Sequence, residues 1–417
     1  MIRESTRNLL KNLLFIRQAA NSPVLANADF IRLTFGCGFN GLGRIGEQVI
    51  IGLLVFKLTD SSEWVGIAMA LYFLSFAVFG TTAGIIADWM DRRVLLFRIE
   101  VLIIVNLGAF AAVVSLGWAS LWMILALTLV SGAIRAMHHP VRSSYAYDLL
   151  GGQHVVAALG LLNFGVRSGQ LIGALATGAV IEQFGGAVAL LGLTGAHGLA
   201  LGWFFFLKTT GASASQVHAP IRENLREYVQ ELRSNRILLM LVVVTACVEV
   251  FGFSFATALP ELAEGRFDAG ADGLGYLYAA RALGGILASL ILTSVISLKK
   301  RGRLYIGVIF SFGISMLLLA QANLFWLALT ALVFIAMMAT ASDILTQSMV
   351  QLSVPNHLRG RAMGAWTFAI GSAPLGHLEM GYLIVAFGLS GALMANGFML
   401  IATGLIVLIA MPRLREL

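Results

Sequence analysis

The chain has 417 residues, of which 59% are hydrophobic and only 12% are charged, and its mean hydropathy is +0.87. Ordinary globular proteins carry about 25% charged residues, so this composition excludes a water-soluble protein, which could not bury so much apolar surface. The net charge of +7 predicts no nucleic-acid partner, because basic loops beside anionic lipid head groups account for it.

The first segment, 1–28, is polar and then amphipathic. Four leucines alternate there with basic residues: Leu9, Leu10, Leu13 and Leu14 with Arg7, Lys11 and Arg17. This pattern predicts a cytoplasmic helix that lies on the membrane surface, and it does not match a cleavable signal peptide.

Twelve apolar runs follow, and each can cross a bilayer as a helix, which takes about 20 residues. The predicted spans are 29–57, 64–87, 94–116, 118–140, 156–182, 186–207, 237–262, 273–298, 304–321, 323–349, 362–387 and 389–410. We therefore predict an all-α membrane protein of twelve transmembrane helices in two six-helix pseudo-repeats. The N-terminal half is 29–207 and the C-terminal half is 237–417.

The basic residues predict the orientation of these spans. With both ends of the chain in the cytoplasm, most of the 28 Lys and Arg residues fall in cytoplasmic segments. Only Lys57 and Arg266 fall on the opposite side of the membrane, and the others lie within the spans. By the positive-inside rule, both termini are cytoplasmic. The expected location is the inner (plasma) membrane of the cell, as a multi-pass protein.

The longest polar stretch, 208–236, separates the two halves and contains the sequence APIRENLREYVQELRSNR. Pro220 suits the first turn of a helix. The apolar residues after it fall on one helical face: Ile221, Leu225, Tyr228, Val229 and Leu232. We expect a cytoplasmic linker with an interfacial helix.

The halves also resemble each other. When the first half is shifted by 203 residues (357 − 154), five positions coincide: His154 with His357, Gly173 with Gly376, Gly178 with Gly381, Phe184 with Phe387 and Gly185 with Gly388. Two six-helix repeats are a transporter architecture, in which the substrate site lies between the halves near the midplane.

The sequence GIIADWMDRR, 84–93, lies between the second and third spans. It resembles the loop signature of the major facilitator superfamily at Gly84, Asp88, Arg92 and Arg93. The resemblance implies a gate in which Asp88 accepts hydrogen bonds from N–H groups at the start of the eleventh span, near Arg359 and Arg361. The alternative is a solvated loop that only sets the topology.

Three further stretches extend the resemblance over nearly the whole chain. GQLIGALATG, 169–178, is similar to the glycine-rich antiporter motif of the superfamily, but Ala174 and Thr177 depart from it and leave the mode of coupling open. VPNHLRGRAMG, 354–364, and DFIRLTFG, 29–36, resemble the branch that contains the enterobactin exporter and macrolide efflux pumps.

Motifs of enzymes are absent or out of context. GLGRIG, 41–46, has the spacing of a dinucleotide site but follows no strand, and its glycines indicate close helix approach instead. There is no P-loop, no H-E-x-x-H and no G-x-S-x-G. We therefore predict no catalytic residues, no enzyme activity and no cofactor. The adjacent His138 and His139 form no set of metal ligands, so no metal site is predicted.

Polar side chains inside the spans are the candidate functional residues, because each intramembrane charge costs about 2.5–3.5 kcal/mol on insertion scales. They follow helical stripes and predict a substrate cavity lined by Asn40, Arg44, Glu47, Arg135, His138, Arg167, Gln170, Arg281, Gln347 and His377. The third, sixth, ninth and twelfth spans lack such stripes, and the resemblance implies that these four face the lipid.

The charges differ between the halves. The first half brings mainly arginines and the second mainly acids, which predicts a basic wall and an acidic wall around an amphipathic substrate with an anionic group. The alternative is that these charges pair across the interface and hold the halves together. Desolvation disfavours a charged carboxylate, so a buried acid can load and release a proton. The predicted carriers are Glu249, then Glu379, then Asp343.

His377 and Glu379 lie in the same span, PLGHLEMGYL, but residues two apart point about 200° apart on a helix. His377 corresponds to Ala174 in the repeat and lies on the stripe of Arg167, so it is predicted to face the cavity. Glu379 is predicted to point into a neighbouring helix or the cavity edge.

These features favour a secondary transporter that exports a small amphipathic molecule, drug-like or siderophore-like, by alternating access and proton antiport. Its expected partners are that substrate, protons and membrane lipid, and it is expected to act as a monomer. Two alternatives stay open at this point: an importer or lipid flippase of the same fold, and a membrane receptor or enzyme that transports nothing.

Overall fold

The computed structural model describes residues 23–211, 235–295, 301–354 and 366–411, and the regular structure in these ranges is helical. The helices of the first half are α2 (Pro23–Ala26), α3 (Ala28–Thr59), α4 (Ser62–Trp89), α5 (Arg92–Ser115) and α6 (Leu121–Phe205). Those of the second half are α8 (Arg236–Phe251), the short η1 (Phe253–Ala258), α9 (Leu259–Glu261) and η2 (Leu262–Arg266), then α10 (Gly270–Val295), α11 (Arg301–Ala320), α12 (Phe325–Leu352) and α14 (Ala373–Ala410).

The two longest helices contain breaks at glycine. The backbone of Gly151, Gly185 and Gly388 has positive φ, at 70°, 82° and 73°, where a side chain would be strained. These breaks divide α6 into a first section (121–150), a second (152–184) and a third (186–205), and α14 into 373–387 and 389–410. The shift of 203 residues in the sequence brings Gly185 onto Gly388, so the two breaks occupy equivalent positions in the two halves.

Eight stretches of the described residues are long and apolar enough to cross a membrane. Two of them, Ala158–Phe205 and Trp366–Ala410, have 48 and 45 residues and contain the breaks at Gly185 and Gly388. About 20 residues cross the hydrocarbon layer, so each of these two stretches is long enough for two crossings.

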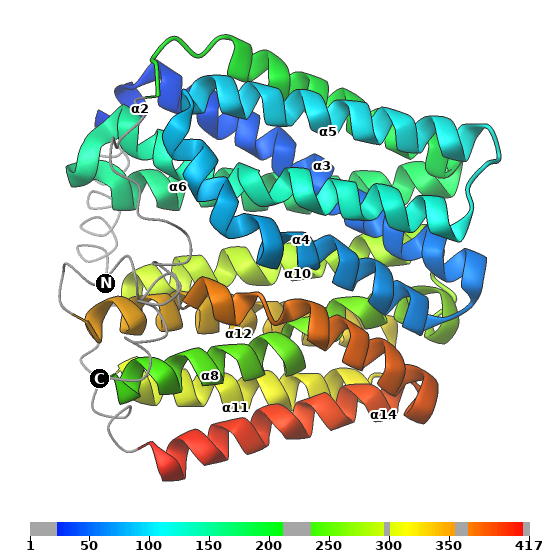
Figure 1. Ribbon diagram of the computed structural model, residues 1–417. Helices are drawn as coiled ribbons and strands as arrows, with labels where there is room; N and C mark the ends of the chain where they lie inside the picture. Colours follow the sequence, from blue (N-terminus) through cyan, green and yellow to red (C-terminus); the bar gives the residue numbers. More distant parts are fainter. Residues whose placement is uncertain (1–22, 212–234, 296–300, 355–365, 412–417) are drawn as a thin grey trace, which may run out of the picture.

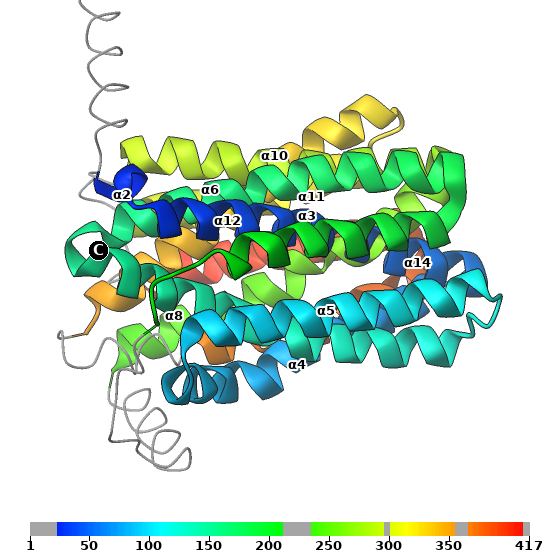
Figure 2. The ribbon, with the colours of Figure 1, turned by 90° about the horizontal axis from the view of Figure 1, so that it is seen from above.

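The helices form two bundles, α3–α6 and α8–α14, which lie side by side in Figure 1; in Figure 2, seen from above, most of the second bundle lies behind the first. The start of α3 and the end of α14 lie at one end of the molecule, at the left of Figure 1, and we call this the terminal end. The loop between α3 and α4 lies at the opposite, distal end.

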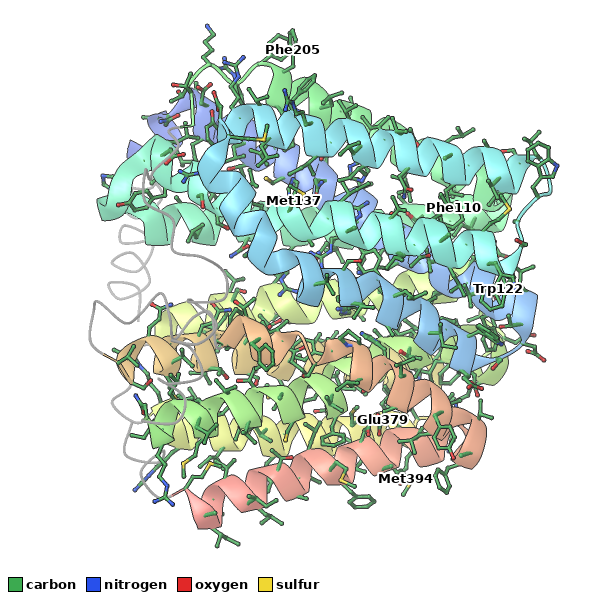
Figure 3. All side chains as sticks on the ribbon, viewed as in Figure 1. Phe110, Trp122, Met137, Phe205, Glu379 and Met394 are labelled. Carbon is green, nitrogen blue, oxygen red and sulfur yellow. The ribbon has the colours of Figure 1, made fainter. Side chains whose placement is uncertain are left out.

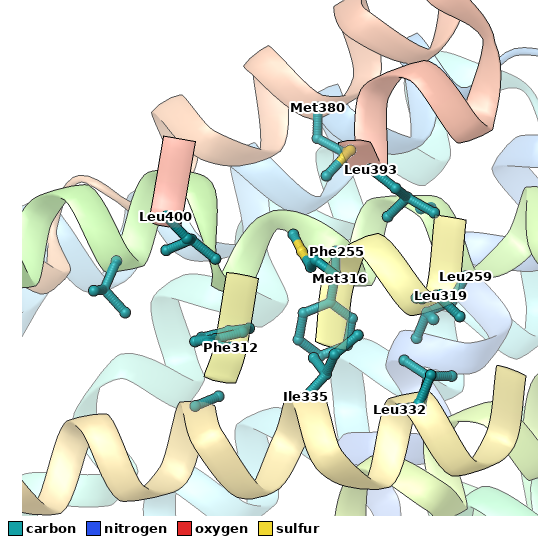
Figure 4. Packing of buried hydrophobic residues seen from close by; sticks show 14 of the residues in the cluster. Phe255, Leu259, Phe312, Met316, Leu319, Leu332, Ile335, Met380, Leu393 and Leu400 are labelled. Atoms are coloured by element: carbon teal, nitrogen blue, oxygen red, sulfur yellow. The ribbon is translucent and has the colours of Figure 1, made fainter. Parts of the chain in front are cut away.

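Each bundle has its own apolar core. One core is drawn from α2–α6, and the other mainly from α8–α14. Figure 4 shows Phe255 of η1 packed among residues of α11 and α12, including Met316 and Ile335. The outer surface is also apolar, with large side chains such as Trp122 and Phe205 exposed (Figure 3). An apolar exterior around packed interiors is what contact with lipid requires.

Equivalent glycine contacts recur within the two halves. A Cβ atom on Gly173 of α6 would lie 2.7 Å from the Cα of Leu42 in α3, and a Cβ atom on Gly376 of α14 would lie 2.7 Å from the Cα of Val250 in α8. Both glycines therefore allow two helices to touch backbone to backbone. The shift of 203 residues found in the sequence relates these two packing positions.

The same relation holds where the two halves meet. A Cβ atom on Gly275 of α10 would lie 2.7 Å from the carbonyl oxygen of Ala174 in α6. A Cβ atom on Gly66 of α4 would lie 2.5 Å from the carbonyl oxygen of His377 in α14. Because Ala174 and His377 coincide under the shift, the crossings of α6 with α10 and of α4 with α14 are copies of one arrangement.

Candidate functional site

Polar contacts join the two halves at the distal end. The Nζ of Lys57, in α3, lies 3.2 Å from the Oε1 of Glu264 in η2. The hydroxyl of Ser62, at the start of α4, donates a hydrogen bond to Glu261 of α9. With the glycine crossings described above, these contacts hold α3 and α4 against the second half at this end.

The predicted gate loop lies at the terminal end. Nη1 of Arg92 forms an ion pair with Asp148 of α6 at 2.6 Å, and Nη1 of Arg93 donates to the carbonyl oxygen of Lys208 at 3.3 Å. Both arginines thus bind within the first half. The surroundings of Gly84 and the side chain of Asp88 lie outside the described part of the structure, as does the whole of Arg359 and Arg361. The gate therefore stays a prediction.

Arg167 extends from the second section of α6 to the other half. Its Nη2 donates to the Oγ1 of Thr340 in α12 at 3.3 Å. A Cβ atom on Gly285 of α10 would collide with the guanidinium group, so the glycine provides the space that Arg167 occupies. Asp343, about one turn after Thr340 on α12, is close enough for its charge to interact with that of Arg167.

Three other arginines gather near Arg167. The charges of Arg44 in α3, Arg142 in α6 and Arg281 in α10 all act on it. Arg142 is buried, and within the described ranges its Nε has no hydrogen-bond partner. Like charges that act on one another repel, and more so where the dielectric constant is low. This group of four arginines, which we call the arginine cluster, is therefore suited to hold an anion.

Two acids lie on the second-half side of the arginine cluster. Glu249, in α8, is buried, and its charge interacts with those of Asp343 and Arg281. The guanidinium group of Arg281 also lies over the rings of Phe255 and Tyr278, 5.6 and 6.0 Å from their centroids. Apolar rings, cations and two acids thus surround one region between α6, α8, α10 and α12.

Three predicted cavity residues instead belong to a hydrogen-bonded network inside the first half. Nε of Arg135 donates to Oε2 of Glu47 at 2.6 Å, and Ser131 donates to the other oxygen of that carboxylate. Asn40 donates from Nδ2 to Oε2 of Glu100, in α5, at 3.0 Å. The structure therefore brings Asn40, Glu47 and Arg135 together in one network of the first half.

Glu100 and His197 complete this network, and neither was a candidate. His197 lies in the third section of α6, its Nδ1 is 2.6 Å from Oε1 of Glu100, and its Nε2 is 3.1 Å from Nη2 of Arg135. The third and sixth spans lack stripes of polar residues, but each of them brings one residue, Glu100 or His197, into this network. An ionisable side chain inside the membrane is costly wherever it lies, so the presence of Glu100 and His197 in apolar spans was a signal that could have identified them.

The glycines of GLGRIG make room for this packing. A Cβ atom on Gly41 would lie 2.5 Å from the carbonyl oxygen of Val166, and one on Gly43 would collide with the ring of His197. The interpretation of this motif as a site of close helix approach is confirmed.

His377 and Glu379 have separate surroundings. His377 is buried, its Nδ1 lies 2.9 Å from the hydroxyl of Thr257, and its ring stacks on Phe73 of α4 at 4.9 Å. Glu379 accepts a hydrogen bond from Nδ2 of Asn396, at 3.1 Å, within α14 (Figure 3). His377 thus lies where the halves meet, and Glu379 faces a neighbouring segment of its own half.

The remaining candidates have fewer contacts. His138 is buried beside Phe204, with 6.2 Å between ring centroids, while Gln170 and Gln347 are partly exposed. In the ranges that the structure covers, no three His, Cys, Asp or Glu side chains are grouped so as to hold a metal ion.

Two helical bundles with equivalent internal contacts and a charged region between them are the architecture of many secondary transporters. The sequence model of the family described as Major Facilitator Superfamily matches residues 33–376. The chain therefore belongs to this superfamily.

Relatives and solved structures agree with this family. The chain is 26% identical over 388 residues to the uncharacterized MFS-type transporter YfiS of Bacillus subtilis (strain 168), covering 86% of this chain and 87% of that protein. It is 22% identical over 361 residues to the staphyloferrin A transporter of Staphylococcus aureus, covering 84% and 87%.

The fold is similar to that of solved transporters. The nucleoside transporter NupG superposes with a TM-score of 0.75 at 11% identity, over 91% of this chain and 98% of that one. The D-xylose–proton symporter superposes with a TM-score of 0.71 at 15% identity, over 93% and 99%.

Proposed function

We propose that the protein is a proton-coupled exporter of a small amphipathic molecule that carries an anionic group. The observation that carries this proposal is the arginine cluster. Four cations from both halves meet in the interior, beside the aromatic rings of Phe255 and Tyr278. Anionic groups would bind the guanidinium groups, and an apolar part of the substrate would pack on the rings.

The acids beside the cluster support coupling to protons. Glu249 and Asp343 lie within range of each other's charge and of Arg281 and Arg167. A proton on an acid and an anion on an arginine affect each other's binding through these charges. Protonation of Glu249 or Asp343 changes the charge beside the arginines, so the occupancies of the proton and the anion are linked.

The relative from Staphylococcus aureus supports the substrate class, because its name is that of a siderophore transporter. It is compatible with the sequence resemblance to the branch of the enterobactin exporter and macrolide efflux pumps.

We include in the proposal twelve spans, with the breaks at Gly185 and Gly388 dividing two of the long stretches, and an inner-membrane monomer with both termini in the cytoplasm. In that orientation the distal end, where the contacts between the halves lie, faces the outside of the cell.

Export can be tested in cells by mass spectrometry of the growth medium. Strains that overproduce the parent protein, Arg167→Lys or Arg167→Ala are compared with a strain that lacks the gene. We expect an anionic metabolite to accumulate outside with the parent. Lysine should retain part of this export, because the charge survives while the bidentate fork is lost, and alanine should abolish it. Equal, small effects of both changes would indicate a structural role for Arg167.

The direction of transport needs a separate comparison. Uptake of the same metabolite into inverted membrane vesicles, with none into right-side-out vesicles, is the result expected of an exporter. The opposite result would indicate an importer.

A further inference from the structure

The buried network of the first half contains a histidine between an acid and an arginine. The side chains of His197 and Glu100 are both 0% exposed, and those of Arg135 and Glu47 are 2% and 0% exposed. Water therefore does not reach these groups in the described conformation. The hydrogen bonds that these groups form lie within the network, so their geometry shows where the proton of His197 lies.

The distances assign the tautomer of His197. A guanidinium group has only N–H donors, so Nε2 of His197, at 3.1 Å from Nη2 of Arg135, must be the acceptor. The single proton of the neutral ring is then on Nδ1, which donates to Oε1 of Glu100 at 2.6 Å. Arg135 is consequently held from two sides, by Glu47 through Nε and by His197 through Nη2.

Both carboxylates act only as acceptors in this arrangement. Glu100 accepts from Asn40 and His197, and Glu47 accepts from Ser131 and Arg135. Two ionised carboxylates, one guanidinium group and a neutral ring give the network a charge of −1 (1 − 2). A proton taken up by His197 would neutralise that charge.

The same proton would break the contact with Arg135. It binds to the lone pair of Nε2, and the new N–H then faces an N–H of the guanidinium group, donor against donor. The imidazolium would remain paired with Glu100 through Nδ1. Arg135 would lose its acceptor at Nη2, and its Nη1 has no hydrogen-bond partner in the described parts of the chain. Two of its nitrogen atoms would then be available to another acceptor.

We propose that His197 is a proton-sensing positioning residue, which fixes Arg135 on Glu47 while it is neutral and releases one side of Arg135 when it takes up a proton. This proposal rests on the proposed transport function. Among the described residues, the titratable and charged groups around His197 are Glu100 of α5, Glu47 of α3, and Arg135 and His138 of the first section of α6; Tyr72 of α4 and Arg142 of α6 act in turn on Arg135 and His138. The network connects α3, α5 and the first and third sections of α6. A change in the protonation of His197 therefore acts on contacts that join these helices.

Nuclear magnetic resonance can read the protonation of His197 directly and needs no substrate. The full-length protein is labelled with ¹⁵N-histidine in lipid nanodiscs, and the His197 signals are assigned by their absence in His197→Asn. We expect the neutral Nδ1–H tautomer at high pH and an imidazolium as the pH is lowered. An Nε2–H tautomer, or a ring that stays neutral at every pH at which the protein remains folded, would overturn the proposal.

A second measurement tests the consequence for conformation. Spin labels at the exposed positions Tyr147 and Leu352, at the terminal ends of the first section of α6 and of α12, report the separation of the halves. The labelled parent lacks Cys37 and Cys247 and carries Glu249→Gln and Asp343→Asn, so that the two acids beside the arginine cluster do not titrate. We expect the distance distribution to depend on pH in this parent. His197→Asn keeps a donor for Glu100 but does not titrate, and should make the distribution independent of pH.

The controls separate this role from a structural one. His154→Asn makes the same change at a histidine outside the network and should keep the pH response. His197→Gln offers an acceptor to Arg135 in place of Nε2 and should also lose the response while keeping the conformation of the parent at high pH. A pH response that survives in both His197 variants would contradict the proposal. Failure of export alone would not, because neither measurement depends on transport.

Discussion

Arg135 and Glu47 form an ion pair that is almost completely removed from solvent, with side chains 2% and 0% exposed. A pair of this kind contributes little net stability compared with apolar side chains, but loss of one partner leaves the other charge buried and unpaired. Because the pair is buried, substitution of either residue alone should destabilise the first half.

Arg135→Ala should lower the free energy of unfolding by about 3–5 kcal/mol, because Glu47 stays buried without its cation. The double variant Glu47→Gln/Arg135→Ala removes both charges and should be less destabilised than the single one. Denaturant unfolding of the purified proteins in detergent measures both. A double variant that is as unstable as the sum of the two single variants would show that the charges do not interact.

Glu249 is the acid that we expect to carry the coupled proton, since it is buried and its charge acts on both Asp343 and Arg281. Glu249→Gln mimics the protonated form and should leave substrate exchange intact while it abolishes accumulation driven by a pH gradient. Both are measured in proteoliposomes with the metabolite found in the growth-medium comparison. If this variant still concentrates that metabolite like the parent, the proton is carried elsewhere, and Asp343→Asn is the next variant to measure.

Helices could be predicted from the sequence with close agreement. Each of the apolar runs overlaps a helix of the structure, although the first section of α6 continues past the predicted end at residue 140 to Gly151. Length and hydropathy suffice for this, because a spanning helix satisfies its own backbone hydrogen bonds. The repeat was also visible, because backbone contact demands glycine at equivalent positions.

The partners of the buried charges could not be predicted in the same way. Helical spacing tells which residues share a face, but not which helix that face meets. Asn40 and Glu47 were therefore placed on the cavity, although they bind Glu100 and Arg135 inside the first half. His197 was missed because it stands alone in an apolar segment and forms no stripe.

The crossing of α6 with α10 depends on close backbone approach at Gly275. Gly275→Ala should force these helices apart, because the new Cβ atom would lie 2.7 Å from the carbonyl oxygen of Ala174. Spin labels at the exposed positions Leu58, one residue before the end of α3, and Phe387, directly before the break at Gly388, should then move apart.

Gly192→Ala is the matched control, since a Cβ atom on Gly192 would meet nothing within 4 Å. It should leave the distance between the labels unchanged. An unchanged distance in Gly275→Ala as well would mean that the crossing tolerates a side chain and does not set the closure of the distal end.

The molecule as a whole consists of two equivalent bundles, joined at the distal end by the glycine crossings and by contacts such as that of Lys57 with Glu264. Between them, the arginine cluster and its two acids lie where both halves contribute side chains. A rocking motion of one bundle against the other would open the distal end and close the terminal end around this region. We propose that the charge of the cluster selects what is carried and that the acids link that cargo to protons.

The most direct test is transport by the purified protein in proteoliposomes under an imposed pH gradient. Three probes are compared: staphyloferrin A, the amphipathic anion 8-anilinonaphthalene-1-sulfonate and the amphipathic cation ethidium. The arginine cluster predicts that at least one anion is concentrated at the expense of the gradient, that ethidium is not, and that Arg167→Ala abolishes the movement of the anion. Concentration of ethidium alone, or movement of the anions that ignores the pH gradient, would contradict proton-coupled transport of an anionic substrate.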